Sequence, residues 1–532
     1  MALSHKVRGR LAYWLAALVP LAFLGLFFAY PLATILKRGL GESVPTDVWF
    51  DRGTLQIAWF TVWQAAVSTV LTLAVGLPLA WATARLAFRG RGLVRALVVV
   101  PFVLPTVVVA TAFLALLPPS LQQGVVPILL AHVFFNVAVV VRVVGGYWSR
   151  LDPRLWDAAA TLGASPAQRL RQLTLPALRP ALAAASALTF LFCFTSFGVV
   201  VILGGPRYAT LEVDIYNLAT QAFDLRAAAA LSLLQLAAVT AVVVVASVLE
   251  GRAGARMPLA SELAATHRPT RRERTALTAI LGGAALLFGL PLAALVRQSF
   301  ATPTGAGLSF YRALGHETPT LLVPPWRAIQ YSLLYSTAAT AIALTVGVLA
   351  AIAIDSARRG AGGGLDTAVM LPLGASAVML GYGFVISFDT SPLDFRDTWW
   401  IVPVVQSLVA VPFVVRILVP ALRAIDPRLR EAAAVLGAPP SRVRREVDVP
   451  LLLRPLGVAG GLAFAISLGE FGATVFLARS DRPTLPVAIY RFLERPGATN
   501  QGTAAALCVV LMAVTALSVA AADRLTARAG SL

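Results

Sequence analysis

Two stretches of this apolar chain share one polar and basic pattern: DAAATLGASPAQRLRQLTLP at 157–176 and EAAAVLGAPPSRVRREVDVP at 431–450. Alanines favour a helix and let a partner backbone approach closely, and a glycine can end that helix in the left-handed conformation. Arginines suit the rim of an acidic or polar groove. A single copy could equally be an amphipathic loop on anionic lipid. Two copies favour a two-fold symmetric protein partner.

The two copies share the same order of helix signals. In each copy an Asp-Pro pair, at 152–153 or 426–427, starts the first short helix and an alanine run continues it. A glycine ends that helix, and a proline is expected to end the second helix just before the chain re-enters the membrane. The matched residues of this pattern are Asp157, Ala158, Ala159, Gly163 and Pro176 in the first copy and Glu431, Ala432, Ala433, Gly437 and Pro450 in the second.

A few polar side chains fall inside long apolar runs, where they are costly and usually have a purpose. His132 and Asn136 share a helical face by their i, i+4 spacing, and Gln406 lies deep in the corresponding span of the second half. They could line a solute pathway or bond a neighbouring helix. Glu470, in AISLGEFGATV, could attract a cationic solute or cap a broken helix. His132 is not expected to bind a metal, because no second His or Cys stands near it.

The sequence lacks the residues that disulfide frameworks, metal sites, enzyme active sites and nucleotide-binding loops require. The two cysteines, Cys193 and Cys508, fall in apolar runs and no CxxC occurs, which excludes disulfide frameworks and structural zinc sites. No nucleophile–base pair or acidic cluster suggests an enzyme. A nucleotide-binding P-loop needs a lysine after a glycine-rich turn, but the lysines are Lys6 and Lys37, neither in such a context. We therefore expect no catalytic residue and no cofactor or metal bound by this chain.

The elements that must position these residues are membrane helices. The 532 residues are 58% hydrophobic and 13% charged, and apolar runs recur at about the ~20 residues that span a bilayer. The sequence predicts an all-α polytopic membrane protein of about twelve spans. We place them near 11–35, 58–84, 95–117, 124–146, 181–204, 226–249, 275–297, 330–354, 365–388, 400–420, 456–478 and 502–522.

Internal repetition divides the chain into two halves. A shift of 274 residues (431 − 157) aligns 151–176 with 425–450 at 13 of 26 identical positions. A shift of 271 (347 − 76) pairs Gly76 with Gly347 and Pro101 with Pro372. Six spans per half leave both halves in the same orientation, as a parallel repeat. We predict a first half over 1–250, a cytoplasmic linker over 251–275 and a second half over 276–532.

Charge bias predicts the sidedness. Loops 147–180 and 421–455 and the linker are rich in arginine, whereas 205–225 and 388–399 are acidic; loop 479–501 departs from this trend. By the positive-inside rule, the repeated loops and both termini are cytoplasmic. The net charge of +19 is then a signature of topology, and no nucleic-acid partner is expected.

The repeated loops resemble the cytoplasmic signature of ABC importer permeases, E-A-A, three residues, Gly, nine residues and I-x-L-P. The whole chain is similar to the fused, twelve-span permeases of thiamine and ferric-iron importers of the bacterial inner membrane. The resemblance implies that two copies of a separate ATPase subunit use ATP and dock on the loops, at the matched residues given above. It also implies that an external binding protein delivers the solute, thiamine or ferric iron. An ion-driven secondary transporter remains the alternative, because parallel six-plus-six repeats occur there too.

Overall fold

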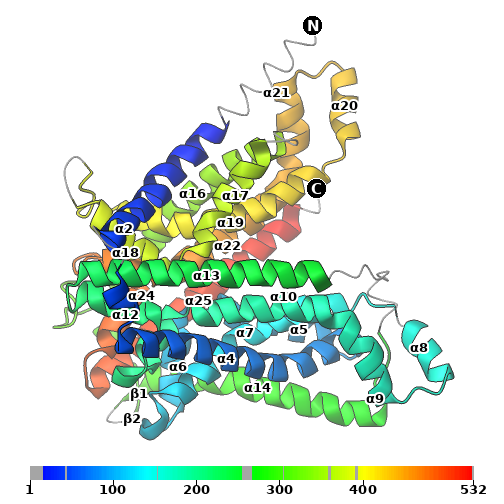
Figure 1. The fold of residues 1–532 in the computed structure, drawn as a ribbon, viewed down its shortest axis with the longest axis horizontal. Coiled ribbons are helices and arrows are strands. Elements are labelled where there is room, and N and C mark those ends of the chain that lie inside the picture. Colours follow the sequence, from blue (N-terminus) through cyan, green and yellow to red (C-terminus); the bar gives the residue numbers. More distant parts are fainter. Residues whose placement is uncertain are drawn as a thin grey trace. The chain divides into compact units, whose positions relative to one another are not determined.

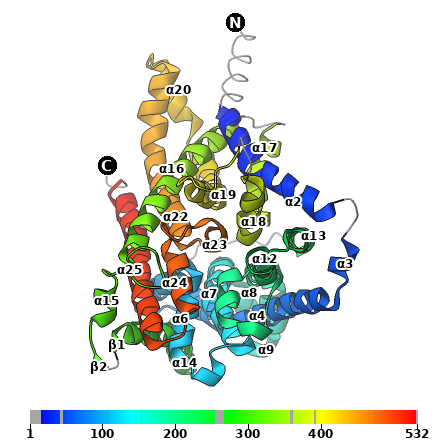
Figure 2. The same ribbon diagram turned by 90° about the vertical axis from the view of Figure 1, so that its left-hand side faces the viewer.

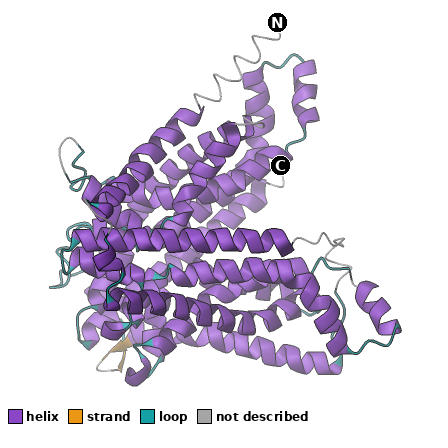
Figure 3. Cartoon of the chain, viewed as in Figure 1, coloured by secondary structure: helices purple, strands orange, loops and turns teal. Residues whose placement is uncertain are grey.

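The computed structural model describes residues 16–41, 45–152, 154–253, 266–302, 305–356, 361–389 and 393–529. Figure 3 shows that these residues are almost entirely helical. The described part holds one short ladder, formed by β1 (Ala301–Thr302) and β2 (Gly305–Ala306). The predicted all-α fold is confirmed. Part of the predicted linker, residues 254–265, lies outside the described residues.

Ten helices in the described ranges are long and apolar enough to cross a membrane, and two bent helix pairs bring the total to twelve if each pair is one span. The ten are Ala16–Leu40, Arg52–Arg85, Val125–Trp148, Pro166–Phe194, Leu225–Val245, Arg271–Phe300, Trp326–Ser356, Ile401–Ala424, Arg445–Gly469 and Ala498–Ala521. The predicted number of spans therefore holds when each bent pair is counted once.

The bent pairs occupy the third span of each half. α5 (Arg91–Val103) meets α6 (Thr106–Leu116) at 100°, and α17 (Ala361–Gly374) meets α18 (Ala377–Ser387) at 96°. Each break follows a helix-interior proline, Pro101 or Pro372, whose carbonyl accepts the last backbone bond at 3.3 Å. Proline removes a backbone donor and crowds the preceding turn, so it weakens the helix close to its end at Val103 or Gly374. The sequence predicted one span at each place, near 95–117 and 365–388, with Pro101 and Pro372 permitting close helix contact or local unwinding.

The described chain forms two compact units. The first unit comprises residues 46–214 and 234–301, and the second comprises the described residues within 1–45, 215–233 and 302–532. The first unit contains α3 (Thr46–Trp49), α4 (Arg52–Arg85), α5, α6, η2 (Pro119–Leu121), α7 (Val125–Trp148), α8 (Arg154–Thr161), α9 (Pro166–Arg169), η3 (Leu170–Thr174), α10 (Leu175–Phe194), α11 (Phe197–Leu203), η4 (Gly205–Arg207) and α14 (Arg271–Phe300).

The second unit is built mainly from the C-terminal part of the chain. Figure 2 shows its α24 and α25 side by side. It contains η1 (Gly25–Ala29), α2 (Tyr30–Leu40), α15 (Ser309–Ala313), α16 (Trp326–Ser356), α17, α18, α19 (Ile401–Ala424), α20 (Pro427–Val435), α21 (Pro440–Val443), η6 (Arg444–Asp448), α22 (Val449–Gly469), α23 (Thr474–Leu477), α24 (Leu485–Leu493) and α25 (Ala498–Ala529). The boundary between the units passes through α12 (Leu211–Thr220) and α13 (Leu225–Ala253).

The first span of each half packs with helices of the other half. In the first unit, Phe288 of α14 meets Phe134 of α7 edge to face, with ring centroids 5.6 Å apart. In the second unit, Phe27 of the N-terminal span lies 6.2 Å from Phe384 of α18, and the Tyr30 hydroxyl donates to the Ser387 carbonyl at 3.3 Å. The compact units therefore combine most of one sequence half with the first span of the other.

The duplication is visible in individual contacts. A Cβ on Gly76 of α4 would lie 2.8 Å from the Val140 Cβ, and one on Gly347 of α16 would lie 2.9 Å from the Val414 Cβ. Real carbon atoms rarely approach so closely, so both glycines permit tight helix crossings. A second repeated contact links the hydroxyl of Thr61 or Ser332 to the backbone nitrogen of Leu211 or Leu485, respectively, at 3.0 and 2.6 Å.

Candidate functional site

The first repeated loop folds as a helix, a turn and a second helix, as the sequence predicts. The predicted end of the second helix at Pro176 is wrong, because this helix runs on without a break from Pro166 to Phe194. α8 ends at a left-handed Gly163, with φ +80°. The Gly163 nitrogen donates to the Ala160 carbonyl at 3.0 Å, and the Ala164 nitrogen donates to the Ala159 carbonyl at 3.0 Å. This pair of bonds is a Schellman cap. Ser165 and Gln168 then form a reciprocal capping box that starts α9.

The second loop has the same geometry 274 residues later. Asp426 caps α20 by accepting from the Arg428 nitrogen at 2.9 Å. Gly437 has φ +80°, and its nitrogen donates to the Ala434 carbonyl at 3.0 Å. The Ala438 nitrogen completes the cap with a 3.0 Å bond to the Ala433 carbonyl. The two loops therefore present one backbone shape twice, and Figure 1 shows α8 and α20 each beyond the end of a long helix.

The predicted contact residues lie largely on the surface of these loops. Ala159, Pro176 and Ala433 are partly buried, and the rest are exposed: Asp157, Ala158, Gly163, Glu431, Ala432, Gly437 and Pro450. Sequence reasoning missed the most exposed apolar side chains, Leu162 and Leu436, each 88% exposed beside its glycine. The sequence does contain a signal for them, because TLG at 161–163 aligns with VLG at 435–437, so the same leucine precedes the glycine in both copies. Exposed leucines at matched turns are typical of a surface that a partner covers.

His132 and Asn136 lie in a buried polar cluster of the first unit. The Ser68 hydroxyl and His132 Nδ1 are 2.9 Å apart, and the Asn136 amide donates to Cys193 Sγ at 3.4 Å. The Gln64 amide donates to the Cys193 carbonyl at 2.8 Å. His132 and Asn136 are only 2% and 3% exposed, and His132 Nε2 has no protein hydrogen-bond partner. The cluster thus links α4, α7 and α10 by hydrogen bonds and leaves His132 Nε2 free to bond another polar group.

Gln406 occupies the matching position in the second unit, on α19. It is 1% exposed, and its Oε1 has no protein partner. Ser467, which matches Cys193 at the same shift, is also buried with an unpartnered hydroxyl. Both units therefore keep polar atoms at equivalent depths, although their residue types differ.

Glu470 lies at the break after α22. Its carboxylate oxygens accept from the backbone nitrogens of Ala473 and Thr474 at 2.8 and 3.0 Å, at the start of the short helix α23. The side chain is 7% exposed. Ser196, at the matching position of the first half, makes no such cap at α11. Within the described residues, no group of three or more His, Cys, Asp or Glu side chains could hold a metal ion.

A charged cluster lies at the other end of the second unit from α20. Because α19 runs from Ile401 toward α20 and α22 runs back, residues 393–399 and 470–484 share the opposite end of these spans. There Arg479 bonds both Asp397 and Asp481. Partial burial raises the pKa of the Asp481 carboxyl. The bond to Arg479, a bond to its own backbone nitrogen and the charges of Arg479 and Arg482 together outweigh that effect and hold the pKa below its ordinary value. The spans thus carry distinct surfaces at their two ends.

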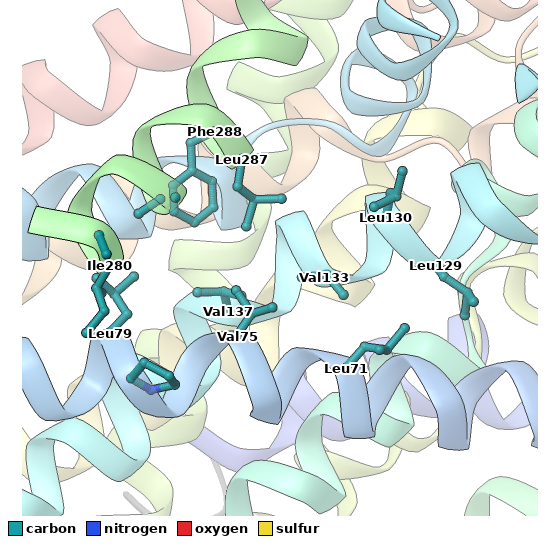
Figure 4. Close-up of a pocket in the computed structure, with 14 residues that line it drawn as sticks. Leu71, Val75, Leu79, Leu129, Leu130, Val133, Val137, Ile280, Leu287 and Phe288 are labelled. Carbon is teal, nitrogen blue, oxygen red and sulfur yellow. The ribbon is translucent and has the colours of Figure 1, made fainter. Parts of the chain in front are cut away.

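The first unit also has an apolar groove of about 430 Å³ among α4, α7 and α14. Figure 4 shows its lining, which includes Leu71, Val75, Val133, Val137, Ile280, Leu287 and Phe288. The lining side chains are hydrocarbon throughout and offer a polar or charged solute no hydrogen bond. The groove is therefore not a candidate solute site.

Comparison with known proteins establishes the class. Residues 73–257 and 343–530 match the family model of the binding-protein-dependent transport system inner membrane component. The chain belongs to this family, and each half carries one copy of the domain. It is a multi-pass inner-membrane permease of a binding-protein-dependent ABC transporter and is not the ATPase. Such a system has separate ATPase and binding-protein partners. Membership in this family replaces the ion-driven secondary transporter considered above.

Individual relatives extend over the full chain. The thiamine transport system permease protein ThiP of Brucella abortus (strain 2308) is 29% identical over 531 residues, covering 95% of this chain and 94% of the relative. ThiP of Escherichia coli (strain K12) is 28% identical over 522 residues, covering 92% and 94%. The putative 2-aminoethylphosphonate transport system permease protein PhnV of Salmonella paratyphi A (strain ATCC 9150 / SARB42) is 31% identical over 245 residues, covering 46% of this chain and 91% of PhnV.

Proposed function

We propose that this chain is the permease of a thiamine importer and that its ATPase docks on the loops that contain α8 and α20. The substrate rests on the full-length similarity to proteins named as thiamine permeases. The ferric iron that the sequence also suggested gains no support from these relatives. The docking surface rests on one observation, the matched Schellman turns that expose Leu162 and Leu436.

Two equivalent loops call for two copies of the ATPase, one on each. Both loops, the linker and both termini are then cytoplasmic, in agreement with the arginine bias of the loops. The binding protein meets the opposite end of the spans. ATP is bound and hydrolysed by the partner, and this chain holds no cofactor. The remaining contacts are with the bilayer, and no nucleic acid takes part.

The mechanism that follows is alternating access driven from the loops. ATP binding closes the two ATPase subunits, and their motion passes through α8 and α20 into α10 and α22. The path then opens outward, the binding protein releases thiamine, and hydrolysis restores the inward-facing state. Because α10 and α22 follow the loops directly in sequence, displacement of a loop acts at once on a span.

For the solute path we propose the matched positions His132 and Gln406, together with Asn136 one turn from His132. His132 Nε2 and Gln406 Oε1 are buried without a protein partner, so a neutral polar contact is available to a solute or water when the helices separate. Glu470 has a different role in this account. Its two bonds to the α23 backbone favour the helix cap over the attraction of a cation.

The test is solute-dependent ATP hydrolysis. The chain is reconstituted in liposomes with its ATPase and binding protein, and hydrolysis is measured with thiamine, with a ferric chelate and with neither. Thiamine is expected to stimulate hydrolysis and the ferric chelate is not. Stimulation by the chelate alone would overturn the assignment of the substrate.

A further inference from the structure

Each loop is closed by a side-chain bond at the same pair of positions. Trp156 Nε1 donates to Thr174 Oγ1 at 2.8 Å. Arg430 Nε donates to Asp448 Oδ1, also at 2.8 Å. Adding 274 to 156 and 174 gives 430 and 448, so the two bonds are equivalent in the repeat. We call Trp156–Thr174 the first clasp and Arg430–Asp448 the second clasp.

The clasps join the coupling helices to the bases of the following spans. Trp156 lies on α8, and Thr174 is the last residue of the π-helical turn η3, directly before α10. Arg430 lies on α20, and Asp448 is the last residue of η6, directly before α22. A π turn inside a helical run is rare and is frequently found at functional sites. Here both copies place the acceptor of the clasp at the end of such a turn.

The chemistry of the two clasps differs although their geometry is the same. The first is a neutral hydrogen bond whose acceptor, Thr174, is 4% exposed. Its Trp156 ring also packs on the apolar cluster of α7 and α10, with the Arg85 guanidinium 5.0 Å from the ring centroid. The second is an ion pair with side chains 31% and 17% exposed. The same connection is therefore made by two unrelated pairs of groups.

We infer that the clasps are positioning devices that make α8 move with α10 and α20 move with α22. This inference rests on the proposed docking of an ATPase on these loops. Leu162 and Leu436, beside the two turns, are largely exposed and do not fix the coupling helices to the spans. Without a clasp, the turn at Gly163 or Gly437 would absorb part of the displacement. ATP would then be hydrolysed with less movement of the spans.

The second clasp offers a charge-reversal test. Arg430→Met removes the donor and Asp448→Asn removes the negative charge. Each is expected to raise the ATP hydrolysed per thiamine transported by about two- to fivefold, the range that loss of one partly exposed ion pair can account for. The double variant Arg430→Asp with Asp448→Arg restores the pair and should return the ratio toward the wild-type value. A pair that only supported folding would change the yield of complex and leave this ratio unaltered.

The same loop provides a matched control. Arg442 Nε and Glu446 Oε1 form an ion pair at 2.9 Å, but its members are 64% and 55% exposed and four residues apart. This pair does not reach from α20 to the span. Arg442→Met should leave the ratio of ATP to thiamine unchanged. An equal rise in this control would overturn the inference.

The first clasp is tested through its hydroxyl. Thr174→Val keeps the shape and removes the acceptor of the Trp156 bond, whereas Thr174→Ser keeps the hydroxyl. The valine variant should raise the ratio of ATP to thiamine and the serine variant should not. Salt screens exposed ion pairs and leaves neutral hydrogen bonds largely unaffected. The Thr174→Val variant lacks the first clasp and keeps the second, which is a partly exposed ion pair. Its ratio of ATP to thiamine should therefore be higher at high salt than at low salt, because salt weakens the second clasp.

The outcomes separate this inference from the proposed function. If the ATPase does not assemble with the wild-type chain, or thiamine does not stimulate it, the proposed function fails and no ratio can be measured. If the complex assembles and transports thiamine but the clasp variants keep the wild-type ratio, the clasps have no positioning role and only this inference is wrong.

Discussion

At the scale of single residues, the Glu470 carboxylate caps the short helix that follows the break in a membrane span. Glu470→Ala removes both bonds to the α23 backbone and leaves the Ala473 and Thr474 nitrogens buried and unpaired. We expect a loss of about 1.5–3 kcal/mol in the free energy of unfolding, typical of hydrogen bonds to a charged group. Glu470→Gln keeps one acceptor oxygen and should lose less. Thermal unfolding of the chain in detergent measures both effects.

The KM for thiamine decides whether Glu470 is a helix cap or a contact for the cation. If it is a cap, the KM for thiamine should be the same in wild type and in Glu470→Gln. A KM raised tenfold with unaltered thermal stability would show instead that the carboxylate contacts the cation.

The glycines at the tight helix crossings give a second prediction. Gly76→Ala and Gly347→Ala each place a methyl carbon within 3 Å of a valine, Val140 or Val414. Overpacking of this kind costs about 1–3 kcal/mol, so both variants should unfold at lower temperature. Gly282→Ala is the control, because no heavy atom lies within 4 Å of its new Cβ. If all three variants behave alike, the crossings are not as tight as described.

Sequence reasoning at this scale found polar residues but not all of their contacts. It left Glu470 open between a solute role and a cap, because the choice depends on where the next helix begins. It identified His132 and Asn136 by their spacing, whereas Ser68, Gln64 and Cys193 join them from other helices. Such long-range neighbours have no local signature in a single sequence.

At the scale of elements, the turns of the two loops give the sharpest prediction. Leu162→Asp and Leu436→Asp change side chains that are each 88% exposed, so the permease itself should fold and insert normally. A carboxylate at the turn should not enter an apolar site on a partner. We expect each variant to retain less ATPase than wild type on purification, and the double variant to retain none. Undiminished co-purification of the ATPase with the double variant would exclude these turns as the docking surface.

The elements show what a sequence pattern can and cannot supply. The caps of both loops were predictable, because Asp-Pro, the alanines and Gly act over a few residues. The bends at Pro101 and Pro372 were marked only as sites of packing or local unwinding. A proline in an apolar run can be tolerated within a span or can end the helix. Which outcome prevails depends on the surrounding helices, and that information is not local.

At the scale of the whole molecule, the repeat was clear from the sequence but the exchange of first spans was not. The match of 151–176 with 425–450 established two halves. It did not predict that α14 would pack with α6 and α4, or α2 with α18. Hydropathy identifies a span without specifying its neighbour, because many apolar faces are chemically alike. The halves of the sequence and the compact units of the fold are therefore different divisions of one chain.

The central claim is that this chain has no ATPase of its own and is driven through its two loops. The most direct measurement is uptake of thiamine against a gradient by liposomes that contain the chain, with its binding protein outside and ATP inside. The account predicts uptake when the ATPase subunit is present and none when it is omitted. Uphill uptake without any ATPase would contradict it.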